Sequence, residues 1–206
     1  GVVISNERYF YNPDGSLKAI NLYGSKKQIM KSQRFSDAGS LEIYFNENEK
    51  AYMMKTYMGD NQQIKYIDLL NEDGNIFKTS KYDDNGELEF NLTTEYDEFS
   101  RKLNDKYYDK FDHLIRQTKY NFFMKAEQTV YFDEKNNIDK KILFEYDKSN
   151  KLISKKIFDK NDKIRIEIIY NKDEFVNNLK EYDENGKLKV IELYNEYGIK
   201  DSEKWH

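Results

Sequence analysis

The feature that most constrains this chain is an aromatic residue, once replaced by leucine, that recurs about every twelve positions. Each such position, called an anchor below, opens a short polar segment. Eleven of the fifteen intervals between anchors are 12 residues long, and the others are 10, 13, 14 and 14. Regular self-similarity of this kind is typical of repeat architectures. The anchors are Tyr11, Tyr23, Phe35, Phe45, Tyr57, Leu70, Tyr82, Tyr96, Tyr108, Tyr120, Phe132, Tyr146, Phe158, Tyr170, Tyr182 and Tyr194.

Two further columns follow each anchor. Six residues after it, thirteen of the sixteen positions are apolar, for example Leu17, Leu88 and Leu188. Four residues after it, many positions hold a residue that tolerates positive φ, as a hairpin built on a type I turn with a bulge requires. These residues are Gly15, Gly39, Asn61, Gly74, Gly86, Asp112, Asn136, Asn150, Asp162, Gly186 and Gly198.

The length of the repeat decides the fold class. Twelve residues are too few for a helix and a strand, but they hold a strand of about seven residues and a turn of about five. Segments such as "LEFNLTTEY", "IRIEIIY" and "LKVIELY" have the β-branched and aromatic composition of strands. Consecutive strands joined by short turns are antiparallel. The sequence therefore predicts an all-β antiparallel meander of about fifteen strands.

The columns also predict a register. If each anchor faces the residue six positions later, aromatic and aliphatic side chains form cross-strand pairs. The anchor, the residue six positions later and the next anchor are separated by even numbers of residues, and such residues point to the same face of a sheet. Both columns are therefore expected on one face, as alternating aromatic and aliphatic rows along its margins. The 13-residue interval between Tyr57 and Leu70 breaks this parity and predicts a bulge there.

Composition favours a thin sheet. Charged residues make up 35% of the chain and hydrophobic residues 38%, which is too polar for a thick core, whereas 16% aromatic residues are too many for a disordered chain. An open, twisted single layer or a spiral is expected, with a sandwich as the alternative. We expect one repeat domain over 1–206. Any seam is expected near 104–127, where the pattern is least regular but the anchors still predict strands.

Charge and composition exclude several classes of function. Acidic and basic residues are interleaved at a net charge of −4, which argues against nucleic acid as a partner. No run approaches the ~20 apolar residues of a transmembrane helix. Cysteine is absent, and the two histidines, His113 and His206, lie in no catalytic pattern. The acidic turns have the beginning of a calcium loop but lack its later ligands. We expect no catalysis, no cofactor and no metal.

Aromatic residues outside the anchor columns are the candidate binding residues. They are Tyr107, Phe122, Phe123 and Trp205, and exposed aromatic side chains are typical anchors for a protein partner or a glycan. The alternative is that the aromatic rows only hold neighbouring strands together. A long antiparallel sheet also has two edges, through which it can associate with itself.

Two resemblances extend this interpretation. "YDDNGEL", "FEYDKSNKL" and "YDENGKL" resemble the tyrosine–aspartate (YD) repeats of bacterial Rhs-type proteins, and more loosely MORN-type hairpin repeats without their Gly-rich tail. The YD resemblance implies a non-catalytic structural scaffold in a bacterium, secreted or on the cell surface rather than cytoplasmic.

The stretch "RYFYNPDGSLKAINLYG" is similar to the extended β-sheet domain of bacterial glycosyltransferases that modify teichoic acids and adhesins. That resemblance implies a sheet that holds an acceptor or oligomerises, with catalysis elsewhere. The leading hypothesis is a non-catalytic β-repeat module that binds a protein partner or a cell-wall polymer, or serves as a scaffold. The alternatives are the acceptor-binding sheet of a glycosyltransferase system and an immunity or antitoxin-type protein.

Overall fold

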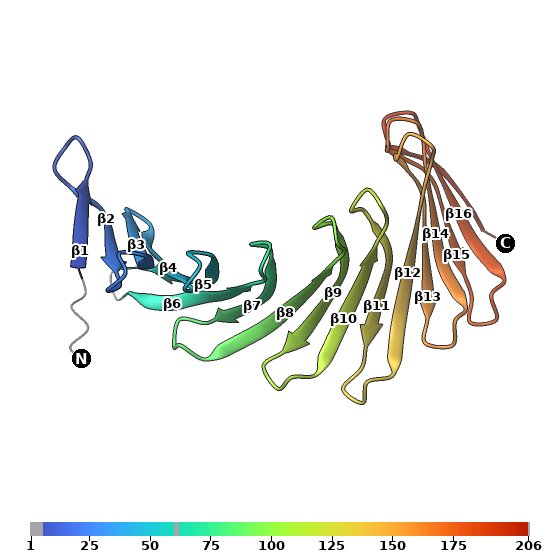
Figure 1. The fold of residues 1–206 in the computed structure, drawn as a ribbon. Coiled ribbons are helices and arrows are strands. Elements are labelled where there is room, and N and C mark those ends of the chain that lie inside the picture. The colour runs from blue at the N-terminus through green and yellow to red at the C-terminus, as the bar shows by residue number, and fades with distance from the viewer. Residues whose placement is uncertain (1–5, 60–61, 206) are drawn as a thin grey trace. The chain divides into compact units, whose positions relative to one another are not determined.

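The computed structural model describes residues 6–59 and 62–205. These residues form seventeen strands and no helix (Figure 1), two strands more than the repeat predicts. The strands are β1 (Asn6–Tyr11), β2 (Leu17–Tyr23), β3 (Ile29–Ser36), β4 (Gly39–Phe45), β5 (Ala51–Met58), β6 (Gln63–Leu70), β7 (Ile76–Tyr82), β8 (Leu88–Tyr96), β9 (Lys102–Asp109), β10 (Leu114–Tyr120), β11 (Ala126–Phe132), β12 (Ile138–Tyr146), β13 (Leu152–Asp159), β14 (Ile164–Tyr170), β15 (Val176–Tyr182), β16 (Leu188–Tyr194) and β17 (Lys200–Trp205).

The chain divides into two compact units. The first comprises residues 1–100 and 108–112, and the second comprises 101–107 and 113–206. In the first unit β1 to β8 pair antiparallel in chain order, and in the second β10 to β17 do the same. Among the described residues of each unit, strands contact only their neighbours in the chain. The predicted antiparallel meander is therefore confirmed, each unit is a single layer, and neither unit is a sandwich.

The turns have the predicted construction, except the tight β3–β4 turn, where Gly39 begins β4 with φ 141° instead of the left-handed turn conformation. In the β15–β16 turn, the Gly186 amide donates to the Asp183 carbonyl at 3.0 Å, and the Asp183 side chain accepts from two later amides. The residue four after the anchor has positive φ in turns that lack glycine as well, with φ 58° at Met124 and 62° at Glu174. Of the positions predicted for this role, Asn61 lies outside the described residues. The hairpin geometry thus imposes the left-handed conformation whatever the side chain.

Most anchors pair as predicted with the residue six positions later, but Phe35 pairs with Ser40 and Tyr57 with Ile64, and the expectation that all anchors share one face is wrong. Tyr182 faces Leu188 across the β15–β16 hairpin, whereas the next pair inward is Glu181 with Val190. Lys189 is therefore an extra residue on β16, and it reverses the alternation of side chains along that strand. The same shift occurs at every described hairpin except the tight β3–β4 one.

The bulges place the two margins of each unit on opposite faces. The alternating aromatic and aliphatic rows exist, but the row at one margin points to one face and the row at the other margin points to the other. The bulge predicted between Tyr57 and Leu70 is present, and it is one of a series. In the second unit, one row consists of Tyr120, Ala126, Tyr146, Leu152, Tyr170, Val176 and Tyr194, and the other of Phe132, Ile138, Phe158, Ile164, Tyr182 and Leu188.

Burial in this sheet is shallow. Among the described residues, the buried hydrophobic side chains are Ile43, Ile142 and Val190, and the buried polar ones are more numerous and include Glu42 and Ser154. Both faces of the sheet are partly exposed to solvent, as the composition predicts. Stability must then come from backbone ladders and from cross-strand side-chain pairs, each of which contributes roughly 0.2–1 kcal/mol.

Candidate functional site

Among the described residues, the most deeply buried charge lies on β4 and belongs to the framework of the sheet. Glu42 is 8% exposed and forms an ion pair with Lys31. It also accepts hydrogen bonds from the hydroxyls of Tyr44 at 2.7 Å and Tyr57 at 2.8 Å. Burial alone would raise the pKa of Glu42, but these three donors together lower it. Burial and the bond to Glu42 raise the pKa of Tyr57 to about 12. The carboxylate of Glu42 thus binds the side chains of Lys31, Tyr44 and Tyr57 at once.

The same arrangement recurs in the second unit. The Tyr120 hydroxyl donates to Asp105 at 2.6 Å, and the Tyr182 hydroxyl donates to Glu167 at 3.3 Å. In each case the acid stands fifteen residues before an anchor tyrosine, as Glu42 does before Tyr57. Sequence reasoning missed these pairs, although this spacing would have revealed them. We assign these carboxylates to the stability of the sheet.

Two of the predicted binding residues lie together at the β10–β11 turn. The rings of Phe122 and Phe123 meet edge to face, with 5.4 Å between their centroids. They are 69% and 59% exposed, and Met124 beside them is 55% exposed. The guanidinium carbon of Arg101 lies 4.2 Å from the centre of the Phe122 ring, a close cation–π contact. We call Phe122, Phe123 and Met124 the aromatic tip.

The other two predicted residues lie elsewhere. Tyr107 on β9 is half-buried, and its ring lies 5.4 Å from the Arg116 guanidinium, near the end of β10 opposite to the aromatic tip. Six residues separate Arg116 from Phe122, or roughly 15–20 Å along the strand. Trp205 on the edge strand β17 is exposed and lies 5.8 Å from the Lys189 ammonium. Six strand spacings, about 28 Å, separate β17 from β11. These four residues therefore do not form one site.

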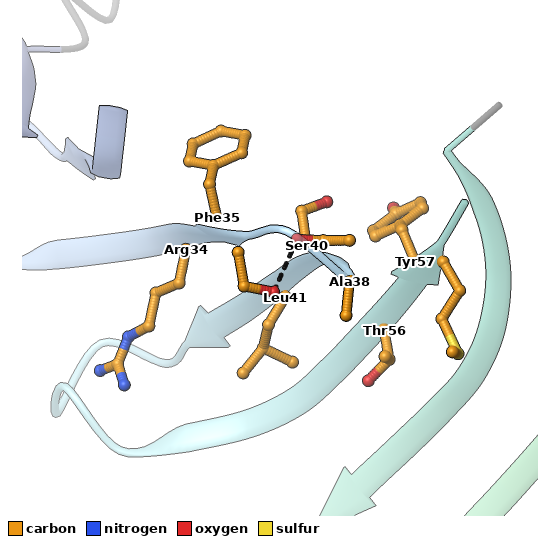
Figure 2. A pocket seen from close by; sticks show the side chains of 10 residues that line it. Arg34, Phe35, Ala38, Ser40, Leu41, Thr56 and Tyr57 are labelled. Atoms are coloured by element: carbon orange, nitrogen blue, oxygen red, sulfur yellow. Dashed lines mark hydrogen bonds between the residues drawn. The ribbon is translucent and has the colours of Figure 1, made fainter. Parts of the chain in front are cut away.

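Two adjoining hollows lie over β1 to β5 of the first unit, and Arg34 and Phe35 line both. The cross-strand partners Phe10, Ala19, Arg34, Leu41 and Thr56 form one row over β1 to β5. The hollow over β3 to β5 has a volume of about 330 Å³, and the hollow over β1 to β3 about 500 Å³. Figure 2 shows Arg34, Leu41 and Thr56 on the same side of the strands, with Phe35 on the other side. We call the two hollows together the Arg34 groove.

The tight β3–β4 turn shapes one end of this groove. Asp37 and Ala38 alone connect the paired residues Ser36 and Gly39, and the Ser36 hydroxyl donates to the Gly39 carbonyl at 3.2 Å. Gly39 has φ 141°, in the range that favours glycine. Gly39 is also the partner of Met58 on β5, so the two strands meet here with no side chain from β4 at this position.

His113 lies in the β9–β10 turn, and His206 lies outside the described residues. No group of three histidine or acidic side chains suited to a metal ion occurs within residues 6–59 and 62–205. In the same part of the chain, no helix has the length and apolarity of a membrane span.

Comparisons with known proteins give distant likenesses. No family model and no curated protein matches the chain. The crystal structure of Staphylococcus aureus TarM, in complex with fondaparinux, α-GlcNAc-glycerol and UDP, is 12% identical with a TM-score of 0.41 over 53% of this chain and 21% of that one. A TcdB2-TccC3 structure is 10% identical with a TM-score of 0.24 over 97% of this chain and 14% of that one.

A porin-like protein from Bacteroides uniformis is 11% identical with a TM-score of 0.27, over 99% of this chain and 91% of that one. The chain spans about a fifth of the length of the TarM chain. The first two matches agree with the weak resemblances to a glycosyltransferase sheet and to YD repeats. At these TM-scores, no argument about the function of this chain rests on them.

Proposed function

We propose that this chain is a non-catalytic β-repeat module that binds a partner through the aromatic tip. The observation that carries the proposal is the display of three large apolar side chains, Phe122, Phe123 and Met124, at one exposed turn. Exposed aromatic residues of this kind supply much of the binding energy at protein and glycan interfaces. The module would act in a bacterium, secreted or at the cell surface.

The tip is held in place before any partner arrives. The Asn121 side-chain oxygen accepts from the Phe123 amide at 3.0 Å and from the Lys125 amide at 3.1 Å. The Lys125 ammonium donates to the Asn150 carbonyl at 2.7 Å and so ties the turn to the β12–β13 turn. A fixed tip loses little conformational entropy on binding, which favours affinity.

The sheet itself supports a scaffold role. Its mid-strand acids, such as Glu42 and Glu167, are bound by lysine and tyrosine side chains from neighbouring strands. General acid–base catalysis needs such a group within reach of a substrate proton. Carboxylates that are held in cross-strand pairs stabilise the sheet. The turns are then the part of the sheet that contacts a partner.

The test is binding of the purified chain to a panel of bacterial glycans and wall polymers, and to proteins in a pull-down. The double variant Phe122→Ser/Phe123→Ser is compared with Phe175→Ser, which removes an exposed aromatic residue from the β14–β15 turn of the same unit. Tyr107→Ser and Trp205→Ser test the remaining predicted residues separately. We expect the double variant to lose binding while its circular dichroism stays β-like.

The result also separates the candidate functions. Binding of a wall polymer lost only in the double variant supports the acceptor-binding alternative, and loss of a single captured toxin supports the immunity alternative. A ligand that binds the double variant and the wild type equally would overturn the assignment to the tip. Unfolding of the double variant would show that Phe122 and Phe123 are structural.

A further inference from the structure

We infer that the Arg34 groove of the first unit binds a small amphiphile with an oxyanion head, a carboxylate or a phosphate, and an apolar tail. This site is separate from the aromatic tip and does not depend on the proposed function. The inference rests on the charge of the groove, on its apolar lining and on the position of Arg34 between its two hollows.

The first observation concerns charge. Arg34 and Lys18 line the larger hollow, and no acidic residue lines either hollow. Neither cation forms an ion pair or a hydrogen bond with another described residue, and both side chains are exposed. On the opposite face of the same strand, Lys31 is paired with Glu42. In a chain with 38 acidic residues, an acid-free hollow with two available cations is complementary to an anion.

The second observation concerns the lining. On one side of Arg34 the smaller hollow is lined by Ala38, Leu41 and Met58, and on the other side the larger hollow is lined by Phe10 and Ala19. An apolar tail of several carbon atoms gains free energy by leaving water for such a surface. Volumes of about 330 and 500 Å³ fall within the range of small-molecule sites.

The third observation concerns geometry. The row from Phe10 through Ala19 to Arg34, and on to Leu41, places Arg34 between the apolar parts of the groove. A guanidinium presents parallel N–H donors that match a carboxylate or a phosphate. The head group is expected at Arg34, with Lys18 adding a second positive charge, and the tail in the hollow near Leu41 and Met58.

The methionines provide a local reporter. The chain has five, and Met58 lines the smaller hollow, whereas Met124 lies in the aromatic tip of the second unit. With isotope-labelled methionine methyl groups, we would titrate the full chain with octanoate, octyl phosphate and the uncharged octanol, and follow each methyl signal by NMR. We expect saturable shifts of the Met58 signal with the two anions, no matching shift at Met124, and weaker binding of octanol.

Two variants with the same change in charge test the role of the guanidinium. Arg34→Gln should weaken anion binding about tenfold, the loss typical of a charge-assisted hydrogen-bonded pair. Lys26→Gln, in the exposed β2–β3 turn, should leave it unchanged. Arg34→Lys keeps the charge but loses the parallel donors, so an intermediate affinity is expected. Circular dichroism checks that each variant is folded.

The outcomes decide the inference. Tighter binding of octanoate than of octyl phosphate identifies the head as a carboxylate, and the reverse order identifies it as a phosphate; both support the site. Equal binding of octanol and the anions, equal binding by Arg34→Gln and the wild type, or parallel shifts at all five methionines would overturn it.

Discussion

A β-carbon built on Gly39 would lie 2.1 Å from the carbonyl oxygen of Tyr57, on the neighbouring strand. The contact is with backbone, which has no side-chain freedom to move aside. We predict that Gly39→Ala lowers the free energy of unfolding by about 2 kcal/mol or more, because the strands must separate and the residue is also strained at positive φ. Urea unfolding followed by circular dichroism measures this.

Gly74→Ala is the matched control. Gly74 also has positive φ, but no atom lies within 4 Å of a β-carbon built there. Its cost is the backbone strain alone, about 1 kcal/mol. Equal costs for the two variants would contradict the steric account of Gly39.

Glu42 makes a second prediction, on acid stability. Its pKa is lowered in the folded chain, so the stability it contributes is present above its unfolded pKa and is lost as the pH falls through its folded pKa. Glu42→Gln should cost about 2 kcal/mol at neutral pH, because it leaves Lys31 without its partner. The difference from wild type should shrink below about pH 4. Urea midpoints at pH 7 and pH 3 check both statements, and a difference that does not change with pH would count against them.

Tyr57 makes the corresponding prediction at high pH. Its pKa is raised to about 12 by burial and by the bond to Glu42. Glu42→Gln removes the negative charge and should lower the pKa of Tyr57, while burial keeps it above its ordinary value. The pKa of Tyr57 is read from the phenolate absorbance as a function of pH, after subtraction of the curve of the same protein with Tyr57→Phe. The measurement is made both in the wild type and in Glu42→Gln. An unchanged pKa would show that Glu42 does not hold the hydroxyl.

A substitution at Met124 is expected to raise the free energy of unfolding, whereas those at Gly39 and Glu42 lower it. It occupies the left-handed position of its turn with φ 58°, where a side chain is strained by roughly 1–2 kcal/mol. Met124→Gly should therefore stabilise the second unit by up to about 1 kcal/mol, since the greater freedom of glycine in the unfolded chain offsets part of the gain. Gly186→Ala, at φ 80° in an equivalent turn, should destabilise it. Thermal unfolding of the pair tests both signs.

The aromatic tip makes a prediction about stability. Phe122 and Phe123 are mostly exposed, so replacing both with serine should change the free energy of unfolding by less than about 1 kcal/mol, the sum of two small surface effects. Tyr107→Ser should cost more, because Tyr107 is half-buried against Arg116. If the order were reversed, the tip would be part of the framework.

The strands and their pairing could be predicted because each hairpin is encoded within one repeat. Tyr182, the turn residues and Leu188 lie within seven consecutive positions, and their local chemistry is sufficient to set the pair. The face to which each anchor points could not be predicted, because nothing in the sequence distinguishes the extra residue Lys189 from the other residues of its strand. The prediction of one apolar face failed for this reason.

The sites needed information from several strands at once. Arg34 meets Phe10, Ala19 and Leu41 only through the register of four consecutive strands, which no single repeat encodes. The tyrosine bond to Glu42 depends on a pairing between β4 and β5 in the same way. Phe122 and Phe123 were found from sequence because they are neighbours in one turn.

The bulges beside the hairpins other than β3–β4 have a consequence for symmetry. Successive repeats reverse both the direction of the strand and the face to which the anchor points, as Tyr170, Tyr182 and Tyr194 do. The axis that lies in the sheet and runs across the strands is the relevant one. A rotation of half a turn about it, combined with a translation of one strand spacing along it, superposes each repeat on the next. The two faces of a unit are then related by a twofold screw operation and have similar polarity. Such a sheet has no dominant inner side, which explains why each unit remains one layer thick.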